Sequence, residues 1–341
     1  MLDDIKRIHQ LDVQDALGIA QKQWQQLTYN YTVHLPKLPD IRNIVLAGMG
    51  GSALPAVFLR SWPHVLLPFE IVRDYSLPFY VNEHTLFISS SYSGNTEETL
   101  SALADAEERH AQIIVLSAGG KLVERAKVVN YPLYLIPQGI QPRMSSFYFL
   151  AALIQILEPL GVIPAGSRQE LEAAAMWLKE QTLPWEAVIP TKNNPAKELA
   201  LELFGKSIVV YSGPKMFPAA NKWKICMNEN AKNVAWVNQY PEFNHNEFVG
   251  WSSHPTEKPY AVVEIRSDLE NDQVQKRFTI SERLLSGRRP APEVVVPVGD
   301  SILKQLLWTS NFGDFVSLYV ALLNGLNPSP VELVEKLKQL L

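Results

Sequence analysis

Residues 85–96 read TLFISSSYSGNT and contain the clearest structural signal in the chain. Thr85–Ile88 is a short β-rich apolar run, and small hydroxylated residues and Gly94 follow it directly. Leu100 and Leu103 then lie on one face of an expected helix. A buried strand, a small-residue turn and a helix in this order predict one β-α unit of a parallel sheet.

The same alternation surrounds this unit. The first such run ends in a glycine-rich turn, and a helix is expected from about Ala53, with Pro55 tolerated in its first turn. Repeated β-α-β units predict an α/β fold with a parallel sheet and flanking helices. The runs expected to form strands are Ile44–Ala47, Val65–Val72, Thr85–Ile88, Ile113–Leu116 and Leu133–Ile136.

A second copy of this plan occurs in the other half of the chain. Ile208–Ser212 is a β-rich run that ends in a small-residue turn, and a helix is expected from about Pro218. A polar helix, Ser167–Gln181, lies between the halves and places the domain boundary between about residues 160 and 190. We divide the chain into an N-terminal domain, 1–160, and a C-terminal domain, 161–341, which ends in a helix after Pro330.

The composition is that of an ordinary globular protein. Of the 341 residues, 47% are hydrophobic and 19% are charged, and the formal net charge is −4. No run of lysine and arginine offers the basic face that a nucleic acid requires, so we expect no nucleic-acid partner. The single cysteine, Cys226, excludes a disulfide within the chain and a cysteine-rich zinc site.

The sequence also argues against a membrane location and a metal. The N-terminus lacks the apolar segment of a signal peptide, and the most apolar stretch identified, Phe147–Leu157, is too short to span a bilayer. No His-x-His or His-Glu-x-x-His motif occurs among the seven histidines. We therefore expect a cytoplasmic protein with no membrane partner, no metal and no cofactor.

Two small-residue loops indicate a binding site. Each follows an expected strand and precedes an expected helix, so both lie at the carboxyl edge of the sheet, where ligands bind. Backbone N–H groups, a helix N-terminus and hydroxyl groups together suit an anion. The loops lack the lysine of a Walker P-loop and the G-x-G-x-x-G spacing, which favours a single phosphate over a nucleotide. The candidate binding residues are Gly50, Gly51, Ser52, Ser91, Ser93 and Thr96.

A purely structural interpretation fits each loop taken alone. Asn95 or Thr96 can serve simply as a helix N-cap. Gly50 and Gly51 can form simply a tight turn. The occurrence of both loops at strand ends in one domain favours phosphate binding.

The two loops resemble those of the sugar isomerase (SIS) domain, a flavodoxin-like parallel-sheet fold that binds phosphosugars. The matching residues are Gly48–Ser52 and Ser91–Thr99. The resemblance implies that the chain is two SIS-type domains with flanking helices, and that the four hydroxyl side chains of the loops ligate the sugar phosphate. It does not by itself imply catalysis, because some SIS domains only sense their ligands.

The rest of the chain resembles one branch of this group, the bifunctional phosphoglucose/phosphomannose isomerases. The matching segments are Gln141–Ser145, Lys224–Lys232, Asn244–Glu247, Asp314–Ala321 and Gly325–Pro330. The resemblance implies an aldose–ketose isomerase, which moves a proton between C2 and C1 of an open-chain sugar phosphate through a cis-enediol(ate). One positioned carboxylate can take and return this proton, and Glu229 stands at the matching position.

Three further residues match the site of this family. Arg143 would face the negative charge of the enediolate. His245 would protonate the ring oxygen, a step that suits a pKa near working pH. Lys338 would complete the site from the C-terminal helix, with Lys336 as the alternative. The structural interpretations are a solvated Glu229, a helix-start arginine paired with a surface acid, a polar turn at His245 and a solvated lysine.

Two positions depart from the family pattern. Ser329 stands where the family usually carries threonine, at a position associated with accepting both C2 epimers. Serine keeps the hydroxyl and loses a methyl group. Around Ala220–Trp223 an arginine is expected nearby and is absent.

The sequence as a whole favours a metal-independent isomerase of glucose 6-phosphate and mannose 6-phosphate. In related isomerases the ring-opening histidine comes from a neighbouring subunit, which implies a homodimer in which His245 completes the partner's site. The alternative is a non-catalytic SIS-domain protein that senses phosphosugars. Such a sensor needs the phosphate loops but not Glu229, Arg143 and His245 together.

Overall fold

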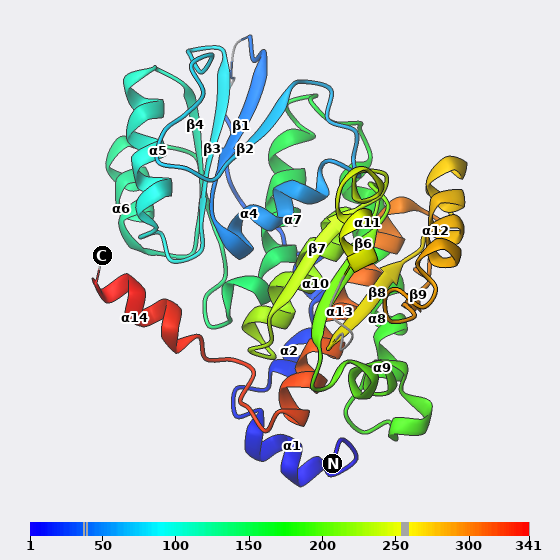
Figure 1. Cartoon of the computed structure of the whole chain (residues 1–341). Helices are drawn as coiled ribbons and strands as arrows, with labels where there is room; N and C mark the ends of the chain where they lie inside the picture. The colour runs from blue at the N-terminus through cyan, green and yellow to red at the C-terminus, as the bar shows by residue number, and fades with distance from the viewer. Residues whose placement is uncertain (37, 39, 254–258, 341) are drawn as a thin grey trace. The chain divides into compact units, whose positions relative to one another are not determined.

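Contacts within the chain separate two compact units, each built around its own parallel sheet (Figure 1). The computed structural model describes residues 1–36, 38, 40–253 and 259–340, and within them the side chains of Ser253, Lys338 and Gln339 are not described. We call Gln23–Trp177 the continuous unit. Met1–Lys22 and Leu178–Leu341 together form the split unit.

The transition between these units falls within the expected range of about residues 160 to 190, but the units differ from the expected domains 1–160 and 161–341 in where the first residues group. The transition lies inside α8 (Ser167–Thr182), between Trp177 and Leu178. The first 22 residues, with α1 (Ile5–Leu11) and α2 (Ala16–Gln21), group with the second half of the chain rather than the first. Local sequence patterns do not reveal this grouping, because it depends on contacts between residues far apart in the sequence.

In the described part of the chain, the continuous unit has a five-stranded parallel sheet in the order β2-β1-β3-β4-β5. This is the flavodoxin-like strand order, and it places the switch point of the topology between β1 and β3. The strands are β1 (Asn43–Ala47), β2 (Phe69–Val72), β3 (Thr85–Ser91), β4 (Gln112–Ser117) and β5 (Leu133–Leu135). The helices are α3 (Trp24–Leu27), α4 (Gly50–Phe58), α5 (Glu97–Glu108), α6 (Gly120–Val129), α7 (Ser146–Leu157) and the first part of α8.

Helices cover both faces of this sheet, α5 and α6 on one side and α4 and α7 on the other (Figure 1). Alternate strand residues such as Val45, Phe87 and Val115 pack with Leu103 of α5 and Leu122 of α6 in one buried cluster. Because β3 is covered on both faces, all its residues are buried, which explains its continuous apolar run.

Three sequence-based boundaries in the continuous unit were wrong. The helix expected from Ala53 begins at Gly50. The second strand begins at Phe69 rather than Val65, directly after Pro68, which lacks a backbone donor. The third strand continues to Ser91, because serines fit a buried strand end as well as a loop.

Within the described residues, the split unit repeats the topology with a four-stranded parallel sheet in the order β7-β6-β8-β9. This order corresponds to β2-β1-β3-β4, which agrees with the internal duplication expected from the sequence. The strands are β6 (Ser207–Ser212), β7 (Ala235–Gln239), β8 (Tyr260–Ile265) and β9 (Glu293–Val295). The longer helices after α8 are α9 (Pro195–Leu203), α10 (Phe217–Glu229), α12 (Asp272–Leu285), α13 (Ile302–Leu323) and α14 (Glu332–Leu340).

Helix α13 forms the core of the split unit. It has 22 residues and contains an 18-residue segment with a mean hydropathy of 1.3, so it is long and apolar enough to cross a membrane by length and composition. In the structure 89% of this 18-residue segment is buried inside the chain, as expected for the core helix of a folded domain. Asn311 and Asp314 interrupt the apolar pattern of α13, so the more uniformly apolar but shorter Phe147–Leu157 is the segment that stands out in the sequence.

Candidate active site

The two small-residue loops lie at the carboxyl ends of β1 and β3, on either side of the switch point. Helix α4 follows the first loop with Met49 as its N-cap, and α5 follows the second with Thr96 as its N-cap. Neither N-cap side chain makes a capping hydrogen bond. The first backbone N–H groups of both helices thus meet at one edge of the sheet, an arrangement suited to an anion.

The loop hydroxyls are held in place by local hydrogen bonds. The Ser91 and Thr96 hydroxyl oxygens lie 2.8 Å apart, and the Gly94 N–H donates to Ser91 Oγ at 3.2 Å. The Tyr92 N–H donates to Ser52 Oγ at 2.9 Å, which connects the two loops. Ser93, which is exposed, accepts from the Asn95 N–H at 3.3 Å. A serine that accepts in this way keeps its own proton to donate to a phosphate oxygen.

Arg143 lies next to the first loop. It belongs to a short 3₁₀ turn, Pro142–Met144, and its side chain is buried. A Cβ atom added to Gly51 would meet the Arg143 backbone nitrogen at 2.8 Å and the Pro142 oxygen at 2.9 Å. The structure therefore places the backbone of Arg143 directly against Gly51, in the loop that also carries Ser52, and this close approach requires a glycine at position 51.

Replacing Gly51 with alanine is expected to displace the turn that carries Arg143. Misplacing a catalytic group by about 1 Å costs about 10²-fold in rate, so kcat/KM for a sugar phosphate should fall by about this factor. Gly50→Ala is the matched control, because its added Cβ meets nothing within 4 Å and only its φ of +48° is unfavourable. Equal losses of kcat/KM in the two variants would show that the close approach at Gly51 is unimportant.

Glu229 is the last residue of α10 and is half-buried. The helix is anchored against α13 by a buried polar cluster. Lys222 and Asp314, both fully buried, form an ion pair, and the Cys226 thiol donates to Asp314 Oδ1 at 3.0 Å. Burial alone would lower the pKa of Lys222, but the charge of Asp314 and the Cys226 sulfur outweigh it and raise the pKa.

The same helix pair meets at a close contact one turn away. The Trp223 indole N–H donates to the Thr309 carbonyl at 2.7 Å. A Cβ atom on Gly313 would overlap the Trp223 ring nitrogen, so a glycine is required where the indole crosses α13. This cluster gives Lys222 a structural role at the Ala220–Trp223 position, where the sequence departs from the family pattern.

The end of α10 is tied to the segment that carries Ser329. Lys232 Nζ donates to the Asn327 and Pro328 carbonyls at 3.0 and 2.9 Å. Asn230 Nδ2 donates to Ser317 Oγ at 2.9 Å. The Ser329 N–H, in a buried residue, donates to Asn327 Oδ1 at 3.0 Å. The structure therefore brings Ser329 to the end of the helix that carries Glu229.

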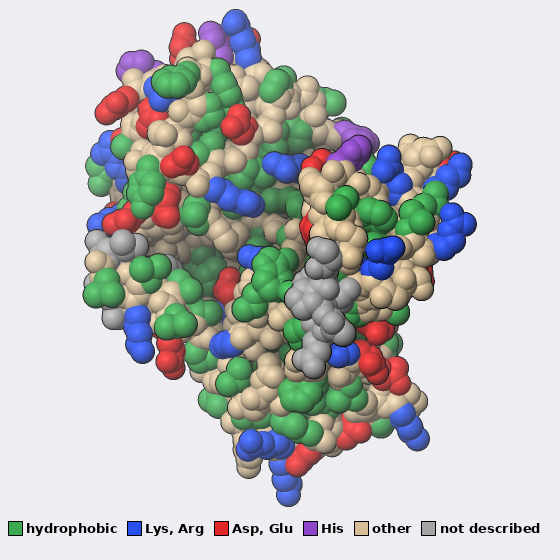
Figure 2. Space-filling model, viewed as in Figure 1, with side chains coloured by type: hydrophobic (Ala, Val, Ile, Leu, Met, Phe, Trp, Pro, Cys, Tyr) green, Lys and Arg blue, Asp and Glu red, His purple; other side chains and the backbone are tan. Residues whose placement is uncertain are grey.

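The lysine candidates lie on α14. Lys336 is exposed, and the side chain of Lys338 is outside the described part, so its predicted role stays a prediction. Leu333, Leu337 and Leu340 are exposed along the same helix, 83%, 57% and 86% accessible. Figure 2 shows hydrophobic side chains at the surface of the molecule. A run of leucines at helical spacing is the kind of surface that another element covers.

His245 does not converge with Glu229 inside the split unit. It is exposed at the end of a 3₁₀ turn, Glu242–His245, which follows the carboxyl end of β7. Helix α10 starts at the carboxyl end of β6 and returns along the sheet for 13 residues, about 20 Å, before it reaches Glu229. Since β6 and β7 are parallel, the two candidates lie at opposite edges of the sheet.

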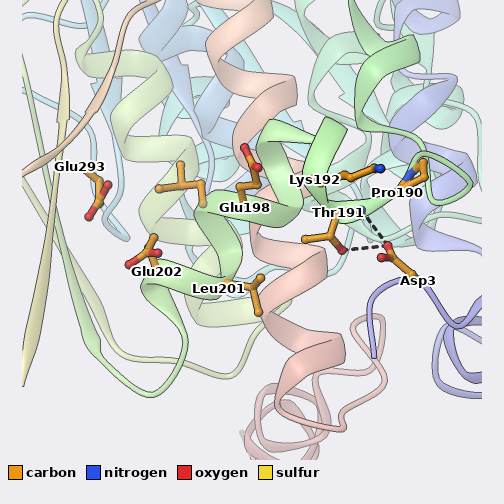
Figure 3. A pocket seen from close by; sticks show the side chains of 9 residues that line it. Asp3, Pro190, Thr191, Lys192, Glu198, Leu201, Glu202 and Glu293 are labelled. Carbon is orange, nitrogen blue, oxygen red and sulfur yellow. Dashed lines mark hydrogen bonds between the residues drawn. The ribbon is translucent and has the colours of Figure 1, made fainter.

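A separate cavity of about 800 Å³ lies in the split unit, between the N-terminal segment and α9 (Figure 3). Asp3 fixes one side of it by accepting from the Thr191 N–H and hydroxyl, both at 2.8 Å. Acidic side chains dominate its lining, which disfavours a phosphate. The lining residues are Asp3, Pro190, Thr191, Lys192, Glu198, Leu199, Leu201, Glu202 and Glu293, and none of them is a candidate site residue.

The duplicated parallel sheets and the phosphate-type loops define a protein of the SIS-domain class. A solved structure of similar fold, a glucose-6-phosphate isomerase like protein from Thermus thermophilus, has a TM-score of 0.65 and 18% identity, with 98% of this chain and 99% of that chain covered. Residues 192–341 match the family model of the bacterial phospho-glucose isomerase C-terminal SIS domain.

Two curated relatives extend the match to most of the chain. A bifunctional phosphoglucose/phosphomannose isomerase from Caldicellulosiruptor bescii is 35% identical over 89% of this chain and 90% of its own length. One of the same description from Aquifex aeolicus is 33% identical, with 94% of each chain covered. The chain belongs to the bifunctional phosphoglucose/phosphomannose isomerase family, which confirms the resemblance found in the sequence and makes the protein a sugar-phosphate isomerase.

Sequence reasoning missed several residues that support the site. The Lys222–Asp314–Cys226 cluster joins residues from two distant helices, and Lys232 holds a distant carbonyl pair. A charged residue amid the apolar pattern of a helix was the one available signal, at Asp314. Nothing local in the sequence marks the carbonyl groups that Lys232 contacts.

Proposed function

We propose that this enzyme interconverts glucose 6-phosphate with fructose 6-phosphate, and mannose 6-phosphate with fructose 6-phosphate, without a metal or cofactor. The observation that carries the proposal is the placement of buried Arg143 against the loop of Gly51 and Ser52, beside two helix N-termini. A phosphate held by the loops would leave the sugar within reach of a fixed cation. The descriptions of the relatives support the same substrates.

The proposed chemistry assigns one task to each candidate. His245 protonates the ring oxygen and opens the ring, assisted by the lysine of α14, Lys338. Glu229 removes the C2 proton and returns it to C1 while the hydroxyl proton of O2 passes to O1, so the aldehyde becomes the hydroxymethyl group and C2 becomes the carbonyl. Arg143 stabilises the negative charge of the enediolate between these two steps.

We also propose that the active unit is a homodimer in the cytoplasm, in which His245 serves the site of the partner subunit. Two observations support the dimer. His245 and Glu229 lie at opposite edges of one sheet, so a single split unit does not bring them together. The leucines of α14 are exposed in the single chain.

The first test is the turnover of both aldose phosphates after treatment with EDTA. We expect fructose 6-phosphate to form from glucose 6-phosphate and from mannose 6-phosphate at rates that EDTA does not change. Loss of activity with EDTA and recovery with a divalent metal would contradict the metal-independent mechanism.

The pattern of turnover tests the role of Ser329 and distinguishes an enzyme from a sensor. Turnover of glucose 6-phosphate alone would assign the loss of mannose activity to Ser329, and Ser329→Thr should then restore it. No turnover of either substrate, together with thermal stabilisation by sugar phosphates, would support the alternative, a non-catalytic phosphosugar sensor.

A further inference from the structure

The two units share a strand order but differ at the switch point. In the continuous unit, neither α4 nor α5 is capped by its N-cap side chain. In the split unit the corresponding helices are α10, after β6, and α12, after β8. The N-cap of α12, Asn271, accepts from the Gln273 N–H at 2.9 Å. The backbone N–H groups at the start of α10 also have an acceptor, which comes from a residue of the loop between β8 and α12.

That residue is Glu270, which lies between β8 and α12 and is only 5% exposed. Its Oε1 atom accepts from the Lys215 N–H at 2.8 Å and from the Met216 N–H at 3.2 Å. Met216 is the N-cap of α10, and its own side chain makes no capping hydrogen bond. A buried carboxylate thus occupies the positive end of a 13-residue helix, the position at which helices bind anions.

The backbone is shaped around this carboxylate. A Cβ atom added to Gly213, at the end of β6, would overlap both Cδ and Oε1 of Glu270. Burial raises the pKa of Glu270, while the N–H groups of Met216 and Lys215 and the Lys215 charge act in the opposite direction. The loop after β1 in the continuous unit likewise has a glycine, Gly48, directly after the strand and a helix N-terminus, that of α4, directly after the loop.

The loop that carries Glu270 is held rigidly. Ser267 Oγ donates to Gln305 Oε1 at 2.5 Å and accepts from the Leu269 N–H at 3.0 Å. Gln305 Nε2, on α13, also donates to Asp268 Oδ1 at 2.6 Å. One hydroxyl group at the carboxyl edge of this sheet makes no hydrogen bond. Ser212 Oγ, at the end of β6, is fully buried and has no hydrogen-bond partner in the described part of the chain.

We propose that the split unit contains a second anion cradle of the phosphate type, made by Gly213, Lys215 and Met216, and that the carboxylate of Glu270 occupies it permanently. The carboxylate takes the position that substrate phosphate takes in the continuous unit, a comparison that rests on the proposed function. Each chain therefore binds one sugar phosphate, and removal of the carboxylate opens a site that inorganic phosphate can enter.

The test compares inorganic phosphate binding by the full-length wild type, Glu270→Ala, Glu270→Gln and Glu202→Ala. Equilibrium dialysis gives the number of phosphates bound per chain, and thermal unfolding in phosphate against chloride at equal ionic strength gives the stabilisation. We expect one phosphate per chain in the wild type and two in Glu270→Ala, with a larger thermal shift in phosphate. Glu202→Ala removes an exposed carboxylate from α9 of the same unit and should behave as the wild type.

The results for Glu270→Gln and for a poorly folding Glu270→Ala also support or overturn the proposal. Glu270→Gln keeps an acceptor oxygen for the two N–H groups, so it should bind one phosphate and show the wild-type shift. If Glu270→Ala binds only one phosphate, or if its thermal shift equals that of Glu202→Ala, the cradle does not exist. If Glu270→Ala folds poorly, its refolding yield should rise in phosphate, and an equal yield in chloride would overturn the proposal.

This test is independent of catalysis. Inorganic phosphate binding to the Glu270 variants is measured without turnover, so its failure leaves the isomerase assignment intact. Conversely, a wild type without isomerase activity would overturn the proposed function while the extra phosphate of Glu270→Ala could still be counted.

Discussion

Replacing Glu229 with glutamine is expected to abolish isomerisation of glucose 6-phosphate and mannose 6-phosphate together. Glutamine keeps the size of the side chain but cannot accept and return a proton, and a positioned base is worth about 10²–10⁴-fold in rate. We expect kcat to fall by this factor for both substrates, with little change in KM, because the phosphate loops and Arg143 lie on other elements. Steady-state kinetics with each aldose phosphate measures both quantities.

The same experiment tests how one base serves two epimers. A single base can reach C2 of both aldoses if rotation about the C2–C3 bond presents the same face of the open chain. A Glu229→Gln variant that lost one activity and kept the other would contradict this. Glu202→Gln, at the exposed end of α9 in the same unit, is the matched control and should retain full activity.

Among the proposed substitutions, replacing Lys222 with methionine is expected to lower the free energy of unfolding the most. The substitution leaves the fully buried Asp314 carboxylate without its cation, which costs about 3–5 kcal/mol. Because the cluster anchors α10, activity should also fall through misplacement of Glu229. Chemical denaturation followed by circular dichroism gives the free energy of unfolding, and the raised pKa of Lys222 means that this contribution persists at neutral pH and is lost only as pH rises above the ordinary lysine range.

The double variant Lys222→Met with Asp314→Leu separates the ion pair from packing. Replacing both charges by apolar side chains removes the buried unpaired carboxylate, so the double variant should be more stable than Lys222→Met alone. Additive losses of stability would show that the two side chains do not interact. Lys304→Met breaks the i,i+4 pair of the half-buried Lys304 with the exposed Asp300; it is the control and should change stability much less than Lys222→Met.

Local patterns were sufficient to locate the five strands of the continuous unit and β6 of the split unit, but β7, β8 and β9 were not predicted. Ile44–Ala47, Ile113–Leu116 and Ile208–Ser212 are continuous apolar runs because both faces of a parallel sheet are covered, so each lies inside an observed strand. Pro218 marked the first turn of α10, where a missing N–H is tolerated. Apolar runs and helix-start prolines are set by residues adjacent in the sequence, so they can be recognised in a single sequence.

The grouping of the units and the contacts within the site could not be predicted, because they depend on segments that are far apart in the sequence. Nothing near Glu270 in the sequence indicates that it binds the start of α10, and nothing near Met1 indicates that the first 22 residues belong with α13. The catalytic roles of Glu229, Arg143 and His245 were inferred from a family resemblance, because a helix-end glutamate, a helix-start arginine and a polar-turn histidine have no distinctive local pattern. Family membership is confirmed by the curated relatives, and the individual roles stay predictions.

The split unit is assembled from both ends of the chain. Lys197, fully buried on α9, donates to Asp3 at 3.1 Å, and Asn311 of α13 donates to the Ala20 carbonyl at 3.0 Å. During synthesis the continuous unit is complete once α8 has been made, so it can fold while the ribosome is still translating. The first 22 residues must wait for α9 and α13 before they find their partners. The split unit is therefore completed only when α9 and α13 capture a segment that was made before the continuous unit.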